Sequence, residues 1–436
     1  MFSNIHFREI LTKGGQILFV RSLGAGLSFL LQILLARRVD QVEFGIYSYC
    51  VTLLMLFSSV GRFGLDLGLV KQVSTAELRN GNESANAWLL STLIFTVIFS
   101  TIISLPLYLS AETISALIFK DTRYAPVVMI FISLVPLYSI MFLLAEGLRG
   151  KKATTTASTI QVLIIPSVII SYLLLSNDSI GLIKIGYLYI CGIIFGIVLG
   201  VYSWFYLLRP APILKVSYIG LATISRYGLP YFIGSIGSIV LTWSDTLIVG
   251  MVSEPENIAA YYAACKIATL TSFVLISVNS IAAPKYAALY ASGDIKTLEK
   301  ISQLSTLLVA LLALLPALIF VIFADELMSL YGKGYNTGSI YLIILTLGQY
   351  INVLCGSVGL MLVMSHNQSL MAKVYIISAI LTCAVSYLLG KEFGALGVAV
   401  GTALGTAFWN VWMLILVKKK VGFWMFSFKP KIFYKG

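Results

Sequence analysis

The sequence predicts an all-α integral membrane protein with about twelve transmembrane helices, arranged as two six-helix lobes in a parallel internal repeat. Three observations predict it: the composition, a series of apolar segments, and an echo between the two halves. Of 436 residues, 59% are hydrophobic and only 11% are charged, whereas about a quarter of a soluble domain is charged. Apolar runs recur from near residue 14 to residue 417, and no gap between them is long enough to fold alone.

Twelve apolar segments are each close to the roughly 20 residues that an α-helix needs to cross a bilayer core. They lie at about 14–36, 44–70, 88–109, 125–147, 157–176, 181–208, 222–251, 259–283, 301–323, 338–364, 371–389 and 394–417. Because twelve is an even number, both termini are expected on the same side of the membrane.

The basic residues indicate which side that is. Of the 30 Lys and Arg residues, 20 fall on one set of loops and segment ends, 7 on the other, and 3 inside segments. The richer side is cytoplasmic by the positive-inside rule. The predicted organisation is a cytoplasmic N-terminus at 1–13, an N-lobe at 14–208, a linker at 209–221, a C-lobe at 222–417 and a basic cytoplasmic tail at 418–436. This tail suits the anionic surface of the inner leaflet.

Matches between the two halves recur at nearly one offset, 210 to 214 residues. They pair Tyr47 with Tyr261, Pro106 with Pro316, and Gly181 with Gly394. Since six helices per half is an even number, both halves have the same orientation in the membrane. Such repeats are related by an axis along the membrane normal and place the substrate path between them.

Six charged candidates fall inside the apolar segments: Arg21, Arg62, Asp66, Glu146, Asp245 and Lys266. An ionised side chain in a bilayer is unfavourable unless it has a partner or a watery cavity. We interpret Arg21, Arg62 and Lys266 as substrate-binding residues that line a cavity. Asp245 and Asp66 are the candidates for ion coupling, because a carboxylate facing water can exchange a proton or bind sodium.

Structural interpretations of these charges stay open beside the functional ones. Asp66 follows Arg62 by four residues, so the two can pair on one helix face. Asp245 and Lys266 fall at matching depth in consecutive antiparallel segments and can form a fixed pair. Glu146 lies close enough to the end of its segment to reach water.

Several other functional classes lack their signatures. The net charge of +12 belongs to short loops that set membrane orientation, which argues against nucleic-acid binding. Gly332 and Lys333 match part of the phosphate-binding motif G-x-x-x-x-G-K-[ST]. Leu327 replaces its first glycine and Gly334 replaces its Ser or Thr, so no phosphate-binding loop is predicted. His6 and His366 have no ligand-like neighbours, so neither a metal site nor a cofactor is predicted. No loop offers paired catalytic acids, and the protein is not expected to be an enzyme.

The five cysteines are scattered through apolar surroundings without a C-x-x-C pair, which indicates free, buried thiols. Their positions are Cys50, Cys191, Cys265, Cys355 and Cys383.

Several stretches together resemble a known family. They are KGGQILFVRSLGAGLSFLLQILLARRVDQVEFGIYSY at 13–49, YGLP at 227–230 with Asp245, AAYYAACKIA at 259–268, NSIAAPKYAALYASGD at 279–294, GKGYNTGS at 332–339 and FGALGVAVGTAL at 393–404. In these the chain resembles the polysaccharide (O-antigen or capsule) repeat-unit flippases of the multidrug/oligosaccharidyl-lipid/polysaccharide exporter superfamily. The resemblance spans nearly the whole chain, and its patterns specify the superfamily better than the substrate.

The resemblance implies a V-shaped pair of six-helix lobes in a bacterial inner membrane that works by alternating access. The implied cargo is an undecaprenyl-diphosphate-linked oligosaccharide, moved to the outer leaflet for surface polysaccharide or lipopolysaccharide synthesis. Coupling to H⁺ or Na⁺ is expected, and the implied partners are membrane lipids, a polymerase and a chain-length regulator. Lipid II flippases of the superfamily usually have two further helices, so twelve segments argue against that branch.

Two other functions remain as alternatives. A cation-coupled drug or metabolite antiporter of the same fold would use an acidic cavity, whereas the buried charges here are three basic and two acidic. A scaffold or receptor without transport would not need the helix-breaking glycines and buried charges.

Overall fold

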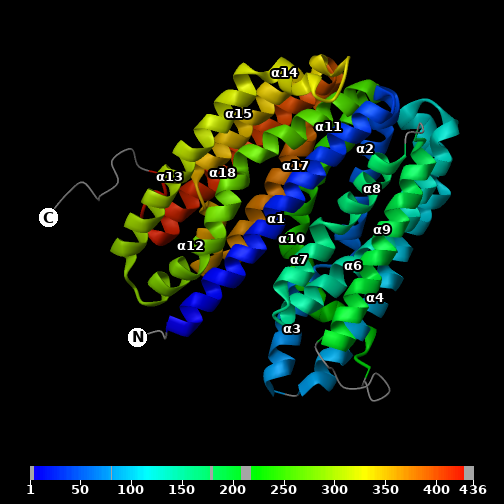
Figure 1. The fold of residues 1–436 in the computed structure, drawn as a ribbon. Helices are drawn as coiled ribbons and strands as arrows, with labels where there is room; N and C mark the ends of the chain where they lie inside the picture. The colour runs from blue at the N-terminus through cyan, green and yellow to red at the C-terminus, as the bar shows by residue number, and fades with distance from the viewer. Residues whose placement is uncertain (1–3, 80, 177–179, 208–217, 427–436) are drawn as a thin grey trace. The chain divides into compact units, whose positions relative to one another are not determined.

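The computed structural model describes residues 4–79, 81–176, 180–207 and 218–426 (Figure 1). In these ranges the regular elements are helices. Those of the first half are α1 (Asn4–Arg38), α2 (Gln41–Gly61), α3 (Leu65–Arg79), α4 (Gly81–Leu109), α5 (Ala111–Ile114), α6 (Ala125–Gly150), α7 (Thr154–Val162), α8 (Ile164–Leu175) and α9 (Leu182–Tyr202). Those of the second half are α10 (Leu221–Val252), α11 (Pro255–Thr269), α12 (Phe273–Ala291), α13 (Ile295–Ile322), α14 (Ala324–Ser329), α15 (Ser339–Cys355), α16 (Val358–Met364), α17 (Gln368–Phe393) and α18 (Ala395–Val421).

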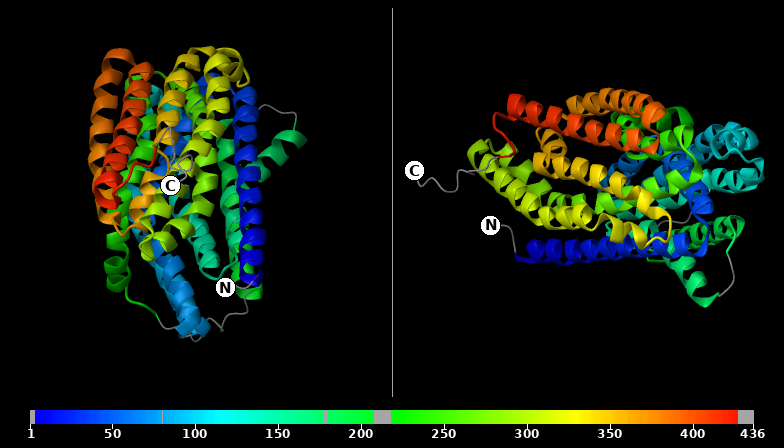
Figure 2. Two further views of the ribbon diagram at one scale, coloured as in Figure 1. Left: turned by 90° about the vertical axis from the view of Figure 1, so that its left-hand side faces the viewer. Right: turned by 90° about the horizontal axis from the view of Figure 1, so that it is seen from above.

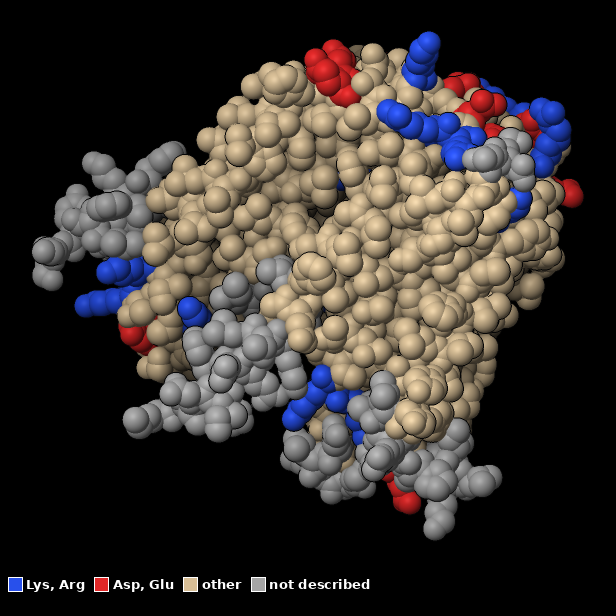
Figure 3. All heavy atoms as spheres, in the orientation of Figure 1, with Lys and Arg blue, Asp and Glu red and all other residues tan. Residues whose placement is uncertain are grey.

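The membrane-spanning character of these helices confirms the predicted fold class. Eleven spans in the described residues are long and apolar enough to cross a bilayer, and a twelfth forms if α7 and α8 are counted together. These two helices are bent by 46° where they meet. Pro166 explains the bend, because it lacks the N–H that would bond to the carbonyl oxygen of Val162 four residues earlier. On the face drawn in Figure 3, the charged side chains gather near helix ends and leave the sides apolar.

The second predicted segment, 44–70, is not one helix. Helix α2 ends at Gly61 and α3 starts at Leu65, with left-handed backbone at Phe63 (φ 52°) and Gly64 (φ 69°) between them. A Cβ atom at Gly64 would collide with the backbone of Tyr231 and Phe232, so only glycine fits this close approach. The sequence analysis placed Arg62 and Asp66 on one helix, but this break separates them.

The two halves repeat each other at the predicted offset. Helices α2 and α11 begin at Gln41 and Pro255, and α6 and α15 begin at Ala125 and Ser339, which are both offsets of 214 residues. Figures 1 and 2 show α13, α15 and α18 running side by side within the second half. Residues of one half therefore have counterparts about 214 positions away in the other half.

The chain divides into two compact units, Met1–Ser235 and Ile236–Gly436, called the first and second unit from here. The division falls inside α10, whereas the predicted linker at 209–221 lies mostly outside the described residues. The first part of α10 packs within the first unit, where the rings of Phe63 and Phe232 stack with centroids 4.8 Å apart.

Both ends of the chain differ from their predicted form. Residues 4–13, expected as a polar terminus, continue α1. The segment expected as a surface tail from residue 418 buries Val421, at the end of α18, and Phe423 and Met425 in an apolar cluster of the second unit. Gln303 also donates a hydrogen bond from Nε2 to the Trp424 carbonyl oxygen over 3.0 Å. The apolar residues among the lysines therefore fix residues 421–425 to the unit, and 427–436 lie outside the described residues.

Candidate functional site

Arg62 and Asp66 form the ion pair that their spacing allowed. Arg62 Nε lies 2.7 Å from Asp66 Oδ1, and the guanidinium also donates to Ser58 Oγ over 3.4 Å and Ser59 Oγ over 3.2 Å. The guanidinium carbon Cζ of Arg62 lies 4.1 Å from the centre of the Phe142 ring, and Arg62 is only 5% exposed. A guanidinium with these contacts has few free donors, so the geometry favours the structural interpretation of this pair.

A second polar cluster in the first unit joins α6 to α7. Arg149 Nη1 lies 2.6 Å from Glu146 Oε1, and Arg149 Nη2 donates to Gln161 Oε1 over 2.8 Å. Gln161 Nε2 in turn donates to Glu146 Oε1 over 2.8 Å. Glu146 is only 3% exposed, so the expectation that it reaches water is wrong: its partners Arg149 and Gln161 enclose it.

Arg21 lies on α1 within electrostatic range of this cluster. The charges of Arg149 and Glu146 both act on its guanidinium. The Arg21 side chain is exposed, in contrast to that of Arg62. With Arg62 and Arg149, the first unit thus gathers three cations and two carboxylates, and Arg21 is the cation most open to a ligand.

Asp245 is the centre of a hydrogen-bonded group in the second unit. Its Oδ1 accepts from the Thr246 backbone N–H over 2.7 Å, and its Oδ2 accepts from the Tyr261 hydroxyl over 3.2 Å. The same hydroxyl lies 3.2 Å from Thr402 Oγ1 on α18, and Cys265 Sγ lies 3.7 Å from Oδ2. Asp245 is 8% exposed, so hydroxyl and amide donors stabilise its carboxylate within the membrane-spanning part.

Lys266 does not form the direct ion pair with Asp245 that equal depth permitted; none is found among the described residues. Its ammonium nitrogen instead lies 4.6 Å from the centre of the Tyr262 ring and 5.5 Å from that of Trp243. The Tyr261 hydroxyl donates a hydrogen bond to the Asp245 carboxylate. The faces of two aromatic rings stabilise the Lys266 ammonium group by cation–π attraction. The fixed strut between α10 and α11 is therefore absent from this conformation.

The counterpart of Tyr261 in the first unit is Tyr47, at an offset of 214 residues. Its hydroxyl lies 2.8 Å from the hydroxyl of Tyr189, and Tyr189 corresponds to Thr402 at an offset of 213. Each unit thus contains its own equivalent of this hydrogen bond. The counterpart of Asp245 is Leu31, which is 3% exposed, so the carboxylate is present in the second unit only.

Sequence reasoning missed Arg149 and Gln161 in the first unit and Thr402 in the second. Arg149 was assigned to a cytoplasmic loop, yet it follows Glu146 by three residues, a spacing that brings side chains together on a helix. For Thr402, applying the repeat to Tyr189 would have given the position. Gln161 had no such signal, because its contact depends on how α7 packs against α6.

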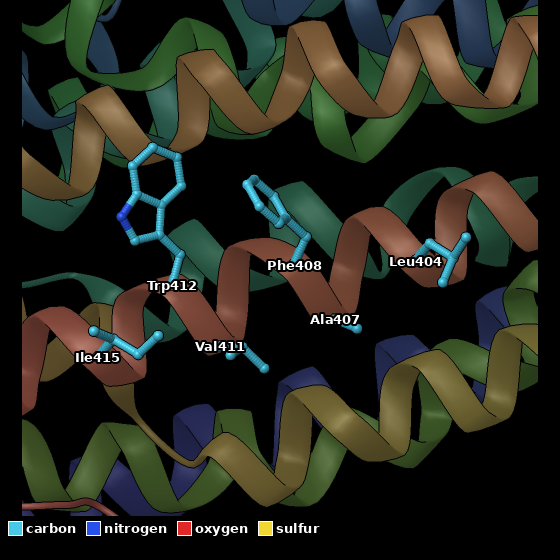
Figure 4. Close-up of a pocket in the computed structure, with 6 residues that line it drawn as sticks. All are labelled: Leu404, Ala407, Phe408, Val411, Trp412 and Ile415. Atoms are coloured by element: carbon cyan, nitrogen blue, oxygen red, sulfur yellow. The ribbon is translucent and has the colours of Figure 1, made fainter.

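An apolar groove of about 530 Å³ runs along α18 (Figure 4). Its lining residues, all from α18, are Leu404, Ala407, Phe408, Val411, Trp412 and Ile415. Figure 4 shows Phe408 and Trp412 on one side of the helix and Ala407 and Val411 on the other. This lining is almost wholly apolar, so the groove suits hydrocarbon and offers no group to hold a charged headgroup.

Solved transporters share this fold. An inward-facing multidrug resistance MATE family transporter of the MOP superfamily matches with a TM-score of 0.77 and 13% identity, over 91% of this chain and 94% of the other. Lipid II flippase MurJ, in an inward closed conformation, matches with a TM-score of 0.71 and 16% identity, over 92% of this chain and 87% of the other.

Among curated proteins, the probable low-salt glycan biosynthesis flippase Agl15 of Haloferax volcanii is 24% identical over 195 residues. The match covers 44% of this chain and 41% of Agl15, so it spans about two fifths of that relative. The MatE family model matches residues 230–388, and the model described as polysaccharide biosynthesis protein matches residues 10–287. Since the latter covers well over half of the sequence, the chain belongs to the polysaccharide biosynthesis protein family, within the multidrug/oligosaccharidyl-lipid/polysaccharide exporter superfamily.

Proposed function

We propose that this protein is a flippase that moves a lipid-linked oligosaccharide from the inner to the outer leaflet of the cytoplasmic membrane by alternating access. The single observation that supports this most is the family match over residues 10–287. The likeness to a probable glycan biosynthesis flippase over 195 residues agrees with it. In bacteria the cargo would be an undecaprenyl-diphosphate-linked repeat unit for O-antigen or a similar surface polysaccharide, and a polymerase and a chain-length regulator would act after it.

The cations of the first unit suit the diphosphate of such a cargo. Arg21 is exposed and lies within electrostatic range of Glu146 and Arg149. A guanidinium can bind two phosphate oxygens at once, and the attraction is strong where the dielectric constant is low. Arg21 is thus the proposed primary contact, with Arg149 held in position beside it by Glu146 and Gln161. Lys266 remains a candidate of the second unit, and Arg62 acts through its pair with Asp66.

Asp245 is the proposed coupling residue. Its carboxylate is held by neutral donors rather than by a cation, so its charge state can change without breaking an ion pair. Gain or loss of H⁺ or Na⁺ there would alter the hydrogen bonds that join α10, α11 and α18. Asp66 is the weaker candidate, because its carboxylate forms an ion pair with Arg62 at 2.7 Å and a change in its charge would break that pair.

Export of cationic drugs or metabolites is the second candidate function. The MatE model matches residues 230–388, which include Asp245, and a carboxylate is what an organic cation would bind. The excess of arginine in the first unit favours an anionic cargo instead.

Deleting the gene in the source cell tests the proposal. We expect loss of long-chain surface polysaccharide and accumulation of lipid-linked units on the inner leaflet. Normal polysaccharide in the deletion strain, with no second flippase present, would reject it. Increased sensitivity to cationic drugs with normal polysaccharide would favour the second candidate.

A further inference from the structure

The second unit contains a stripe of uncharged polar side chains within its membrane-spanning segments. Three carboxamides form it, Asn279 from α12 and Gln349 and Asn352 from α15, and we call them the amide stripe. All three belong to the spans Pro255–Asn279 and Tyr335–Met364. Polar side chains at membrane depth are unfavourable against lipid and face the protein interior or a watery cavity. All three are partly exposed, which indicates the cavity.

Two serine hydroxyls orient the stripe. Ser272, in the turn before α12, donates to Gln349 Oε1 over 2.8 Å, and Asn352 Nδ2 lies 3.5 Å from the same oxygen. Ser357, just before α16, donates to Asn279 Oδ1. These bonds orient the amides, and Asn279 Oδ1 keeps a second lone pair as an acceptor. The amide nitrogens of Gln349 and Asn279 have no hydrogen-bond partner among the described residues, so each leaves two N–H donors open.

A purely structural role would leave a different pattern. Amides that only join helices hydrogen-bond across the interface and are enclosed there. Asn86 has that form: it is 4% exposed and accepts from Trp204 Nε1 over 2.8 Å. The stripe combines the interhelical bonds with exposed, unused donors, and this combination is typical of a prepared binding site.

The surroundings of the stripe decide the class of ligand. Residues 267–284 and 339–364 contain no Lys, Arg, Asp or Glu, and the cations that flank the first range, Lys266 and Lys285, are each six residues from Ser272 or Asn279, so the neighbours of the stripe along the chain are uncharged. Ser272 and Asn279 are seven residues apart, about 10 Å along a helix axis. A stripe of that length with donors and acceptors fits an extended, neutral, hydroxyl-rich group.

We propose that the amide stripe binds sugar hydroxyls of the cargo glycan. This inference rests on the proposed flippase function and adds to it the part of the site that recognises sugar. Carboxamides can donate to one hydroxyl and accept from the next, and a lost hydroxyl leaves buried donors unpaired. The stripe therefore contributes selectivity between glycosylated and unglycosylated lipid.

The test measures the affinity of the purified full chain in detergent for two probes. One is the lipid-linked oligosaccharide extracted from the source cell, and the other is the same lipid with its glycan removed, leaving polyprenyl diphosphate. We expect wild type to prefer the glycosylated probe about tenfold, the effect of two hydrogen bonds. The variant N279L/Q349M should lose this preference and keep its affinity for the bare lipid within about twofold.

Asn410→Leu is the matched control, because Asn410 is a fully buried amide of α18 outside the stripe, and it should keep the preference. If the double variant does not fold, each single variant should lower the preference about threefold. An equal affinity of wild type for both probes, or a preference that survives N279L/Q349M, would overturn the inference while leaving a flippase that recognises diphosphate. Failure to bind either probe would overturn the proposed function itself.

Discussion

Tyr47 and Tyr261 occupy matching places in the two units and have different neighbours. The Tyr47 hydroxyl lies 2.8 Å from that of Tyr189, and the residue of this unit that matches Asp245 is the apolar Leu31. The Tyr261 hydroxyl lies 3.2 Å from Thr402 Oγ1 and also 3.2 Å from a carboxylate, that of Asp245. An equivalent hydrogen bond is thus present in each unit, and a single residue on the preceding helix adds a carboxylate in the second unit only.

The two units also differ in how their carboxylates are stabilised. The first unit pairs its carboxylates with arginine, as in Arg62 with Asp66 and Arg149 with Glu146. The second holds Asp245 with hydroxyl and amide donors and adds an uncharged amide stripe. A repeated scaffold therefore fixes where side chains lie, and substitutions between the repeats decide what each unit can bind.

Leu31→Asp gives the first unit the carboxylate of the second and should have the largest effect. Leu31 is 3% exposed, and the positions that match Cys265 and Lys266 are Val51 and Thr52, so a carboxylate there lacks the thiol and the nearby ammonium group of the second unit. We expect a loss of more than about 3 kcal/mol in the free energy of unfolding, measured by denaturation in detergent. Leu31→Met is the volume-matched control and should stay near wild type. A stable Leu31→Asp protein would show that both units tolerate the carboxylate equally.

Asp245→Asn removes the charge that distinguishes the second unit. The amide can still accept from the Thr246 N–H, and the Tyr261 hydroxyl can turn to accept from it. Stability should therefore change by less than about 1 kcal/mol, while transport should fall by about 5–150-fold, the usual range of coupling between sites. Loss of folding together with transport would instead assign Asp245 a structural role.

Arg21→Ala tests the cationic half of the comparison. Its side chain is exposed, so protein level and unfolding temperature should not change. Loss of a charge-assisted contact with diphosphate should lower export about tenfold. Arg123→Ala, an exposed arginine bound to Asp121 at a helix start, serves as the control. Full export with Arg21→Ala would remove this residue from the site.

The tyrosines themselves should show the smallest difference. Tyr47→Phe removes a bond between two neutral hydroxyls, worth about 1 kcal/mol, whereas Tyr261→Phe removes the contacts of one hydroxyl with both Thr402 and the Asp245 carboxylate, together worth about 2 kcal/mol. Comparing the two unfolding free energies should give a difference near 1 kcal/mol. Equal losses would mean that Asp245 does not strengthen the hydrogen bond of Tyr261.

The spans and the repeat could be predicted from the sequence, because apolar length and residue spacing determine them. The break after Gly61 could not, since it depends on the backbone of Tyr231 and Phe232 meeting Gly64 from a distant part of the chain. The docking of Phe423 and Met425 likewise needs the apolar cluster of the second unit to exist first.

The candidate residues were chosen from the sequence, and the Arg62–Asp66 pair was anticipated, whereas the partners of Asp245, Lys266 and Glu146 were not. The sequence identified Arg21, Arg62, Asp66, Asp245 and Lys266 because charge is conspicuous among apolar residues. The competition for each partner depends on three-dimensional neighbours. The Tyr261 hydroxyl, rather than Lys266, donates to the Asp245 carboxylate, and Gln161 donates a hydrogen bond to the buried Glu146 carboxylate.

Reconstitution of the purified full chain in liposomes tests the central claim most directly. The measurement is the rate at which lipid-linked oligosaccharide, extracted from the source cell, crosses from one leaflet to the other. We predict that wild type accelerates this movement, and that Arg21→Ala and Asp245→Asn each reduce it while remaining folded. The account would be contradicted if wild type transported an organic cation but moved the lipid-linked oligosaccharide between leaflets no faster than in protein-free liposomes.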